Sequence, residues 1–546
     1  MNLQGGPQEQ SAAALDPAHV GDIKGAFGTI LVGDDMPRAG WKSRLKTLLA
    51  IVGPGLIVMT GDNDAGAFGT YTQAGQNYGT SLLWVLPLLV PVLYVNQEMV
   101  LRLGVVSGIG HARLILERFG KFWGAFSVID LFILNALTIV TEFIGISLAL
   151  DYLGLPKIPG VLISAAIIVA AASTGSFKRF ERVCMLLVGG SLLLVPIFVM
   201  VHPDFRAIAR DLIIPGMPEN ADLSKVVLLI IGIIGTTIAP WQLFFQQSYI
   251  IDKRITPRFI QYEKADLWIG IVIVIVGAAA MISFTAATFA EHPEFGKFTD
   301  AGGVADGLGK YVGRIAGVLF ALALIDASII GAAAVGLSTS YALGDVLGLK
   351  HSLHRKVSDA KGFYVAFAAI LLVSAIIVLI PGSPLGLLTV GVQVLAGVLL
   401  PSATVFLLLL CNDKAVLGPW VNGPAMNIFT SAVIAILVIL SLVLTAGVLF
   451  PDLNAAAITA ILIGGGALFT LAGLGFLIYA RLHPAGLQQP ALDRAKRATW
   501  RMAPLTLLAA PRLSAGSRIG LTVLRIYLLI AMILVIVRIV QLALGQ

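Results

Sequence analysis

Long apolar runs constrain this chain more than any other feature of its sequence. Val226–Ile234, Ile271–Ala280 and Phe363–Ile380 belong to segments near the roughly 20 residues that an α-helix needs to cross a bilayer. Lipid offers no partner for an exposed backbone amide, so helices are the structure that such runs adopt there. Only 12% of the residues are charged, about half the fraction usual in soluble domains. The sequence therefore predicts an all-α polytopic membrane protein.

The apolar segments follow one another with short polar connections. We expect helices near 46–76, 80–103, 122–152, 159–175, 183–202, 225–251, 266–291, 314–346, 362–381, 386–411, 425–450 and 457–481. A last apolar stretch, 520–544, contains Arg525 and Arg538. We expect this stretch to span with both arginines reaching the interface, rather than to lie along the membrane surface.

The net charge of +7 could suggest nucleic-acid binding, but the positions of the basic residues indicate membrane orientation instead. Loops after the even-numbered helices hold more than twice as many lysines and arginines as loops after the odd-numbered ones, which places the former in the cytoplasm. The N-terminus is therefore expected in the cytoplasm of a bacterial-type cell, with the chain in the inner (plasma) membrane. We expect no nucleic-acid partner.

The ends of the chain and its cysteines add little chemistry. The first 40 or so residues are polar, so we expect no signal peptide. Residues 482–519 form a basic linker that should lie against the lipid headgroups. Cys184 and Cys411 are the only cysteines, and their separation predicts neither a disulfide framework nor a metal cluster.

Two of the predicted helices are interrupted at matching places. The first contains the run from Thr60 to Ala67, in which Asp62 and Asp64 lie among glycines; carboxylates at bilayer depth require a backbone that opens into a protein-lined cavity. The sixth contains Pro240, which has no N–H to donate to the carbonyl of Thr236. That carbonyl oxygen becomes available to a cation.

Breaks in helices 1 and 6 lead two successive blocks of five helices. Paired interruptions of this kind are typical of inverted-repeat transporters of the LeuT/APC type. The C-terminal ends of half-helices carry negative partial charge, which together with a carboxylate favours a cation at the bilayer midplane. We therefore divide the chain into a cytoplasmic segment (1–45), a 5+5-helix transport core (46–411), helices 11 and 12 (412–481), the basic linker (482–519) and an additional C-terminal helix (520–546).

Several short motifs, in order along the chain, resemble the Nramp (natural resistance-associated macrophage protein) family of divalent-metal transporters. They are Gly53-Pro54-Gly55, Gln73-Ala74-Gly75, Leu83-Trp84, Gln97 with Arg102-Leu103-Gly104, Gly235 to Trp241, Gln393 before Pro401, and Gly418-Pro419-Trp420-Val421-Asn422. The similarity runs from about Gly53 to Asn427 and more loosely through helix 12.

The resemblance implies a metal site and also shows where this chain departs from the family. By resemblance, Asp64, the Thr236 carbonyl and Gln393 would be metal ligands. Ala67 stands where the family has an asparagine ligand, and Ala239 where it has a methionine. Ala65 stands in place of the motif's proline, and Trp241 follows Pro240 where the family has a histidine.

These departures bear on the choice of ion. A thioether is a soft ligand that favours transition metals, so alanine at position 239 removes that preference. What remains is a wider, oxygen-only site, which suits Mg²⁺ because this ion usually retains several waters beside one or two carboxylates. The pattern resembles the Nramp-related magnesium transporter branch. We expect Mg²⁺ as transported substrate, with Mn²⁺ as a second candidate, and no cofactor.

Proton coupling is expected to be dispensable. All seven histidines lie in termini, loops or at helix ends, whereas histidine is the usual group that titrates near neutral pH. Gln246 stands where the family has a further histidine in helix 6, and Ile139 where it has an aspartate in helix 3, although Glu142 is kept. We expect uptake by alternating access, driven by the cation gradient and the membrane potential.

Five polar residues are secondary candidates near the ion. Asp62 and Asn63 either complete its outer shell or cap the broken helix. Asp326 and Glu142 are intramembrane carboxylates, a class that is functional by default, although local hydrogen bonding would also explain them. Gln246 is the fifth.

Two other functions remain open, a proton-coupled Mn²⁺/Fe²⁺ transporter of the ordinary Nramp kind and an amino-acid symporter on the same architecture. The acidic segment around Asp64 opposes the carboxylate of an amino acid. An enzyme is not expected, because the glycines near Lys310 lack the phosphate-loop spacing. No feature sets the oligomeric state, and a monomer is compatible with the sequence.

Overall fold

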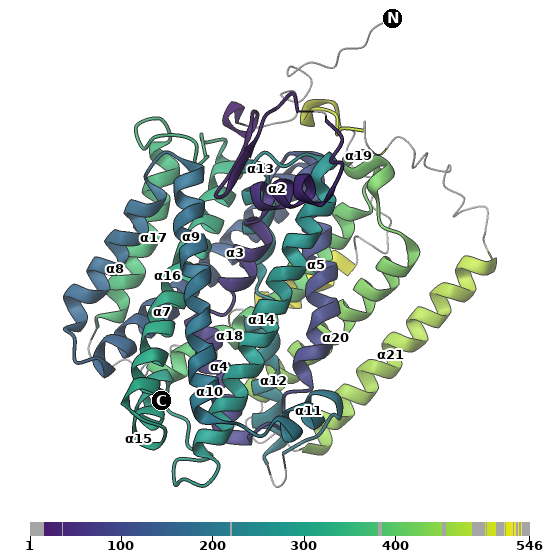
Figure 1. Ribbon diagram of the computed structural model, residues 1–546. Coiled ribbons are helices and arrows are strands. Elements are labelled where there is room, and N and C mark those ends of the chain that lie inside the picture. The colour runs from purple at the N-terminus through teal and green to yellow at the C-terminus, as the bar shows by residue number, and fades with distance from the viewer. Residues whose placement is uncertain are drawn as a thin grey trace, which may run out of the picture.

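The expected spans are present as helices in the structure, which is a computed structural model. It describes residues 16–34, 36–218, 221–380, 385–449 and 455–482, with short stretches between 497 and 537. The unbroken spans, labelled in Figure 1, are α5 (Val85–Ser107), α7 (Lys121–Tyr152), α14 (Ile260–Phe289), α16 (Arg314–Leu347), α17 (Lys361–Val378), α18 (Leu385–Cys411), α20 (Pro424–Leu449) and α21 (Ala455–Leu482). A shorter apolar helix, α8 (Lys157–Ala172), follows α7. The fifth span is α9 (Phe177–Gly190), η2 (Ser191–Leu193) and α10 (Leu194–Val201) in succession.

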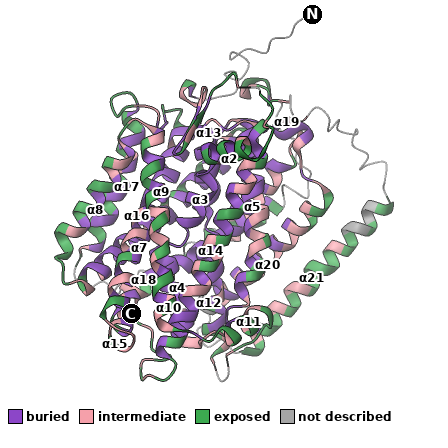
Figure 2. Cartoon of the chain, in the orientation of Figure 1, coloured by how far each residue is buried: buried purple, intermediate pink, exposed green. Residues whose placement is uncertain are grey.

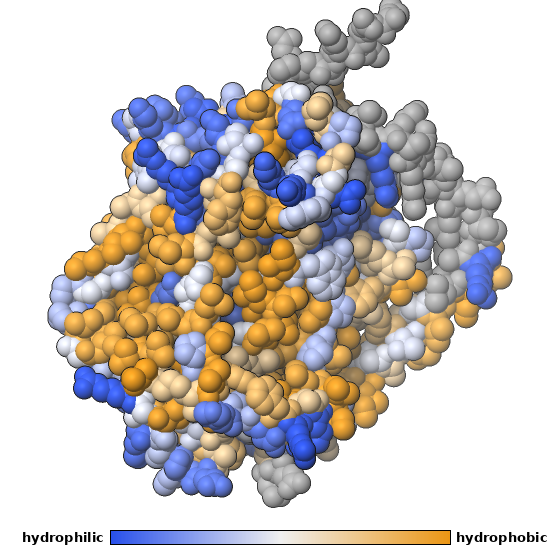
Figure 3. All heavy atoms as spheres, in the orientation of Figure 1, coloured by the Kyte–Doolittle hydropathy of each residue, from blue (hydrophilic) through white to orange (hydrophobic). Residues whose placement is uncertain are grey.

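Length and composition suit these helices to a membrane. Within the described ranges, 10 helices are long and apolar enough to cross one, or up to 11 if a bent pair is counted as one span. Figure 3 shows the matching surface, a hydrophobic belt between two hydrophilic ends. Most of the predicted stretch 520–544 and of the linker 482–519 lies outside the described residues.

The first span consists of three pieces rather than one helix from residue 46. They are α2 (Trp41–Ile51), α3 (Pro54–Thr60) and α4 (Ala65–Tyr78), and α2 is bent by 54° from α3. The ammonium of Lys253 donates to the carbonyls of Ile51 and Val52 at 2.5 and 2.9 Å, while Asp266 accepts from the amide of Gly55 at 2.7 Å. A cation at the end of one helix and an anion at the start of the next complement both helix dipoles and hold the bend.

The sixth span is broken as well, into α12 (Leu223–Thr237) and α13 (Pro240–Asp252). Pro240 occupies the first position of α13, where its missing N–H costs no helical hydrogen bond. Both interruptions expected from the sequence are thus confirmed. They lie inside the bundle, where Figure 2 shows mostly buried residues on α3, α4 and α12.

Several short elements carry too few residues to be predicted from apolar runs. They are α6 (His111–Phe119), α11 (Phe205–Ile213), α15 (Ala301–Tyr311), α19 (Lys414–Leu417), the 3₁₀ turns η1 (Pro17–His19), η3 (Pro257–Phe259), η4 (Gly418–Trp420) and η6 (Leu505–Leu507), and an antiparallel hairpin of β1 (Ile23–Gly25) and β2 (Gly28–Ile30). They cover the two ends of the bundle in Figure 1.

The hairpin belongs to an ordered segment, residues 16–34, which we call the strap. Asp16 accepts from Nε of Arg355, in the loop after α16, at 2.9 Å. Arg254, just after α13, donates to the Ala18 carbonyl at 2.9 Å. The Ala26 amide donates to Glu181 of α9 at 2.5 Å. The strap therefore joins several spans across one end of the molecule, which we call the N-terminal face (Figure 1, top).

Candidate cation site between the two helix breaks

The start of α4 brings two carboxyl groups together. Asp64 caps α4, and its Oδ1 accepts a hydrogen bond from the Ala67 amide at 2.9 Å. Glu142, on α7, accepts from the Ala65 amide at 3.1 Å through Oε2. Both groups rest on Gly331 of α16, where an added methyl group would lie 3.0 Å from Cβ of Asp64 and 2.9 Å from Cδ of Glu142. Both residues are buried.

Gln393 of α18 touches both broken spans. A methyl group added to Gly66 would lie 1.7 Å from its Nε2 and 3.1 Å from Oδ1 of Asp64, so the amide and the carboxylate meet over that glycine. The main-chain oxygen of Gln393 lies 2.1 Å from a methyl group added to Gly235 of α12. Its Nε2 is buried and has no hydrogen-bond partner among the described residues. Gln393 thus lies between the two breaks.

The second break contributes polar groups from the end of α12. The hydroxyl of Thr236 is buried without a partner in the described part of the chain, and its carbonyl precedes Pro240, which has no N–H. Ala239 caps α13 without any side-chain hydrogen bond. The Tyr71 hydroxyl lies 2.6 Å from Oγ1 of Thr237 and so connects α4 to α12. The two breaks are therefore neighbours.

The remaining candidates from the sequence point in different directions. Asp62 faces α13 and accepts a hydrogen bond from Gln242. Asn63 is turned toward α14, where it donates to the Val274 carbonyl at 3.2 Å. Asp326 packs against Gly190 of α9. Gln246 is buried on α13, with neither amide atom hydrogen-bonded to a described residue.

The structure adds two residues that the sequence had not assigned to the site, although Gln97 belongs to one of the motifs named above. Gln242 contacts Asp62, and Gln97 of α5 donates from Nε2 to Oε1 of Gln242 at 2.8 Å. Both glutamines are fully buried. Buried amides inside otherwise apolar spans are a signal that the sequence contained, since an amide at bilayer depth requires partners. The sequence did not show that Gln97 pairs with Gln242 and that Gln242 in turn pairs with Asp62.

The methionine that is nearest to the first break in the sequence has its side chain directed away from that break. Met59 precedes the first break, but its side chain packs against Gly270 of α14. The described histidines, His19, His111, His202, His292, His351 and His354, lie in turns, loops or at helix ends as expected. Among the described side chains at the two breaks, Asp62, Asp64 and Thr236 contribute oxygens, and the ring of Trp241 faces Gly61.

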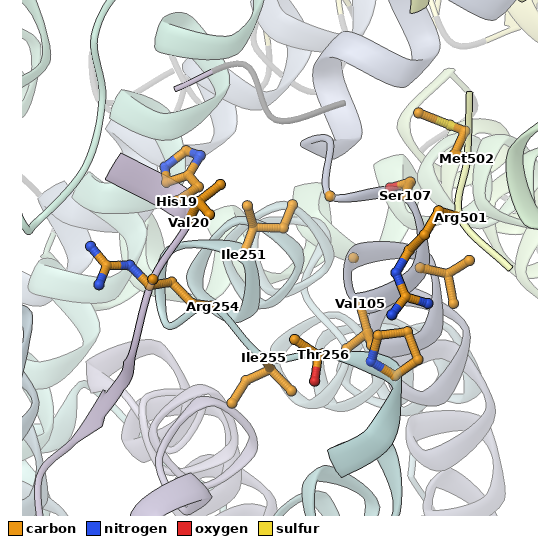
Figure 4. Close-up of a pocket in the computed structure, with 15 residues that line it drawn as sticks. His19, Val20, Val105, Ser107, Ile251, Arg254, Ile255, Thr256, Arg501 and Met502 are labelled. Atoms are coloured by element: carbon orange, nitrogen blue, oxygen red, sulfur yellow. The ribbon is translucent and has the colours of Figure 1, made fainter. Parts of the chain in front are cut away.

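Several cavities lie in the described part of the bundle, and two of them bear on the site. One of about 10 Å³ runs from Ala65 past Gly145 to Phe298 and Asp300, which is room for about one water molecule. Another, of about 100 Å³, opens at the N-terminal face where α5 and α13 end; Figure 4 shows Ser107, Ile251 and Arg501 around it. Asp64 lines neither cavity, so the larger one is not the site described above.

The motifs that resemble a known family also contact one another. Arg102, at the end of α5, donates to the carbonyl of Trp420 and, at 2.6 Å, to Oδ1 of Asn422. It also pairs with Glu98 one helical turn earlier, at 3.2 Å. These contacts fasten α5 to the segment before α20, so this part of the pattern is structural.

Comparison with solved structures defines the class. The chain resembles the Eremococcus coleocola manganese transporter bound to an aromatic bis-isothiourea substituted compound, with a TM-score of 0.59, 21% identity and coverage of 83% of this chain and 99% of that one. The fold is therefore the inverted-repeat fold of LeuT type, with broken helices 1 and 6 and extra C-terminal helices, as the sequence predicted.

Comparison with sequences defines the family. Residues 55–447 match the natural resistance-associated macrophage protein-like (Nramp) family, and the chain belongs to it. Relatives include proteins named divalent metal cation transporter MntH from Burkholderia ambifaria, 30% identical over 53% of this chain and 67% of that protein, and from Ralstonia nicotianae, 28% identical over 72% and 89%. The relatives are transporters, and the chain is a multi-pass membrane transporter and not an enzyme.

Proposed function

We propose that this transporter moves divalent metal cations, with partly hydrated Mg²⁺ as its main substrate and Mn²⁺ as a second one. The family and its relatives support the coarser part of this proposal, a divalent metal cation transporter. The choice of Mg²⁺ depends on one observation: alanines stand at positions 67 and 239, so the side chains at the two breaks offer oxygens and amides but no thioether. Mg²⁺ favours such hard ligands and keeps part of its water.

In this proposal the ion lies between Asp64, the Thr236 carbonyl and Gln393, with the space left by Ala67 and Ala239 occupied by its waters. Glu142 and Gln246 lie farther out. The close approach of Gln393 to both Gly66 and Gly235 supports this arrangement. Asn63 and Asp326, which contact Val274 and Gly190 instead, are placed outside the ion's first shell.

The decisive measurement is uptake into proteoliposomes by the native chain and by the Asp64→Ala variant, with Mg²⁺ and Mn²⁺ offered separately. We expect Mg²⁺ uptake by the native chain and its loss, by about a hundredfold, in the variant, because a charged ligand contributes roughly 3 kcal/mol or more. Uptake of Mn²⁺ with none of Mg²⁺ would disprove the choice of ion. Equal uptake by both proteins would remove Asp64 from the site.

We further propose that transport needs no proton gradient and runs inward, with the N-terminal face in the cytoplasm. A divalent ion gains about 4.6 kcal/mol from a potential of 100 mV, which is ample driving force. The specific rival is proton-coupled Mn²⁺/Fe²⁺ transport, which the contact of Glu142 with the start of α4 would favour. Uptake at clamped voltage separates the two: an inward pH gradient that accelerates uptake severalfold would establish coupling.

A further inference from the structure

One glutamine connects the two helix breaks. Nε2 of Gln242 donates to Oδ1 of Asp62, in the first break, and lies 3.4 Å from the carbonyl oxygen of Thr237, in the second. The position of Gln242 is itself constrained, because its Oε1 accepts from Gln97 at 2.8 Å. The series Gln97, Gln242, Asp62 therefore runs from α5 through α13 to the turn between α3 and α4.

The series is buried, and one of its polar atoms, Oδ2 of Asp62, lacks a hydrogen-bond partner among the described residues. Asp62, Gln242 and Gln97 are all fully buried, each with 0% exposure. No described lysine, arginine or histidine forms an ion pair with Asp62. A buried carboxylate in this condition is costly unless a cation or a proton neutralises it.

A second carboxylate lies close by. Asp64 is two residues away in the same break between α3 and α4, and it is buried as well. Without a cation between them, the two carboxylates repel each other in surroundings of low dielectric constant. Mg²⁺ is commonly bound by one or two carboxylates with waters on its other positions.

We propose that Asp62 is a second carboxylate ligand of the transported cation, and that Gln242 and Gln97 are positioning residues that hold Asp62 at the junction of the two breaks. This inference deepens the proposed function and rests on it for the location of the ion. Oδ1 is held by Gln242, and Oδ2 binds the ion directly or through one of its waters. The same amide reaches the Thr237 carbonyl, so the distance between the breaks and the position of the ligand are set together.

A purely structural role would give the same hydrogen bonds, so the test must separate charge from position. Asp62→Asn keeps an oxygen for Gln242 and removes the charge, whereas Gln242→Leu keeps the charge and removes the positioning bond. The double variant completes a thermodynamic cycle. Gln76→Leu is the matched control: Gln76 is a buried glutamine at the far end of α4, bonded to the Glu294 carbonyl at 3.0 Å.

The measurements are Mg²⁺ uptake kinetics in proteoliposomes and Mg²⁺ binding by calorimetry on the purified full chain. We expect Asp62→Asn and Gln242→Leu each to raise KM and the dissociation constant about tenfold, the loss typical of a charge-assisted contact, with little change in maximal rate. The double variant should be no worse than Asp62→Asn, since Gln242 acts through Asp62. Gln76→Leu should bind Mg²⁺ as the native chain does.

An unchanged dissociation constant in Asp62→Asn would overturn the proposal, and strictly additive effects would overturn the positioning role of Gln242. If Gln242→Leu does not fold, Gln97→Leu releases the same amide and replaces it in the cycle. These outcomes can be distinguished from failure of the proposed function. If the native chain transports Mn²⁺ and not Mg²⁺, the choice of ion is disproved, and the same variants are then compared by their Mn²⁺ uptake and binding.

Discussion

Three glycines set how closely the helices of the site approach one another. Gly66 faces the side chain of Gln393, Gly235 faces its main chain, and Gly331 faces the carboxyl groups of Asp64 and Glu142. The first contact is with the end of a flexible side chain, and the second is with backbone. Substitutions at these positions should therefore have different consequences.

Gly66→Ala should impair transport more than it impairs folding. The new methyl group would lie 1.7 Å from Nε2 of Gln393, so the amide must rotate away from Asp64. We expect Mg²⁺ uptake to fall about tenfold or more. Crowding costs about 1–3 kcal/mol and alanine in place of a helical glycine returns about 1 kcal/mol, so the net loss of unfolding free energy should be about 2 kcal/mol or less. Gly464→Ala, on α21 with no atom within 4 Å of the new methyl group, is the control. Normal uptake by Gly66→Ala would show that Gln393 is not required at its present position.

Helices were predictable from the sequence to the extent that apolar length determines them. The uninterrupted spans such as α7 and α16 have nearly the predicted bounds, because the length of an apolar run indicates directly where a helix crosses the bilayer. The bend at Val52 was missed because it depends on Lys253 and Asp266, which are distant in sequence. The breaks were found from Pro240 and the acidic run, whereas the bond from Gln242 to Asp62 depends on how α13 packs against the first span.

Lys253→Met tests what holds that bend. The ammonium also pairs with Glu181 of α9 at 2.7 Å, and both side chains have 0% exposure. Removing the lysine leaves a buried carboxylate and two carbonyls without their partner, so we expect a loss of about 3–5 kcal/mol of stability. Thermal unfolding of the purified protein measures it.

Lys264→Met is the comparison for that variant. Lys264 pairs with Glu98 at 2.9 Å but is partly exposed, and Glu98 keeps Arg102 as a partner. Its loss should cost about 1 kcal/mol or less. Equal effects of the two substitutions would mean that Lys253 has no special role at the bend.

At the N-terminal face, the stability of the whole molecule depends on an ion pair that includes a titrating histidine, His351. Burial disfavours the charged form of His351, in the loop after α16, but a hydrogen bond and ion pair with Asp345 at 3.0 Å outweigh it and raise its pKa to about 9. A raised pKa means that the stabilisation is complete below the ordinary value of 6.5 and is lost as the pH rises toward 9.

We therefore expect the unfolding free energy to fall between pH 6.5 and 9, by on the order of 3 kcal/mol, and His351→Gln to flatten this dependence. His292→Gln, in a loop at the opposite end of the bundle, should leave it unchanged. Thermal unfolding across this pH range makes the comparison. A slope in His351→Gln equal to that of the native chain would assign the effect to another group.

The strap ties the loop after α16, through Asp16 and Arg355, to the end of α13 and to α9. If uptake proceeds by the expected alternating access, helices that shift relative to one another at this face stretch or release these bonds. Because the Asp16–Arg355 pair is ionic and partly exposed, dissolved salt weakens it. Turnover should therefore quicken with ionic strength on the side of the membrane that faces the strap, and stay indifferent to salt on the other.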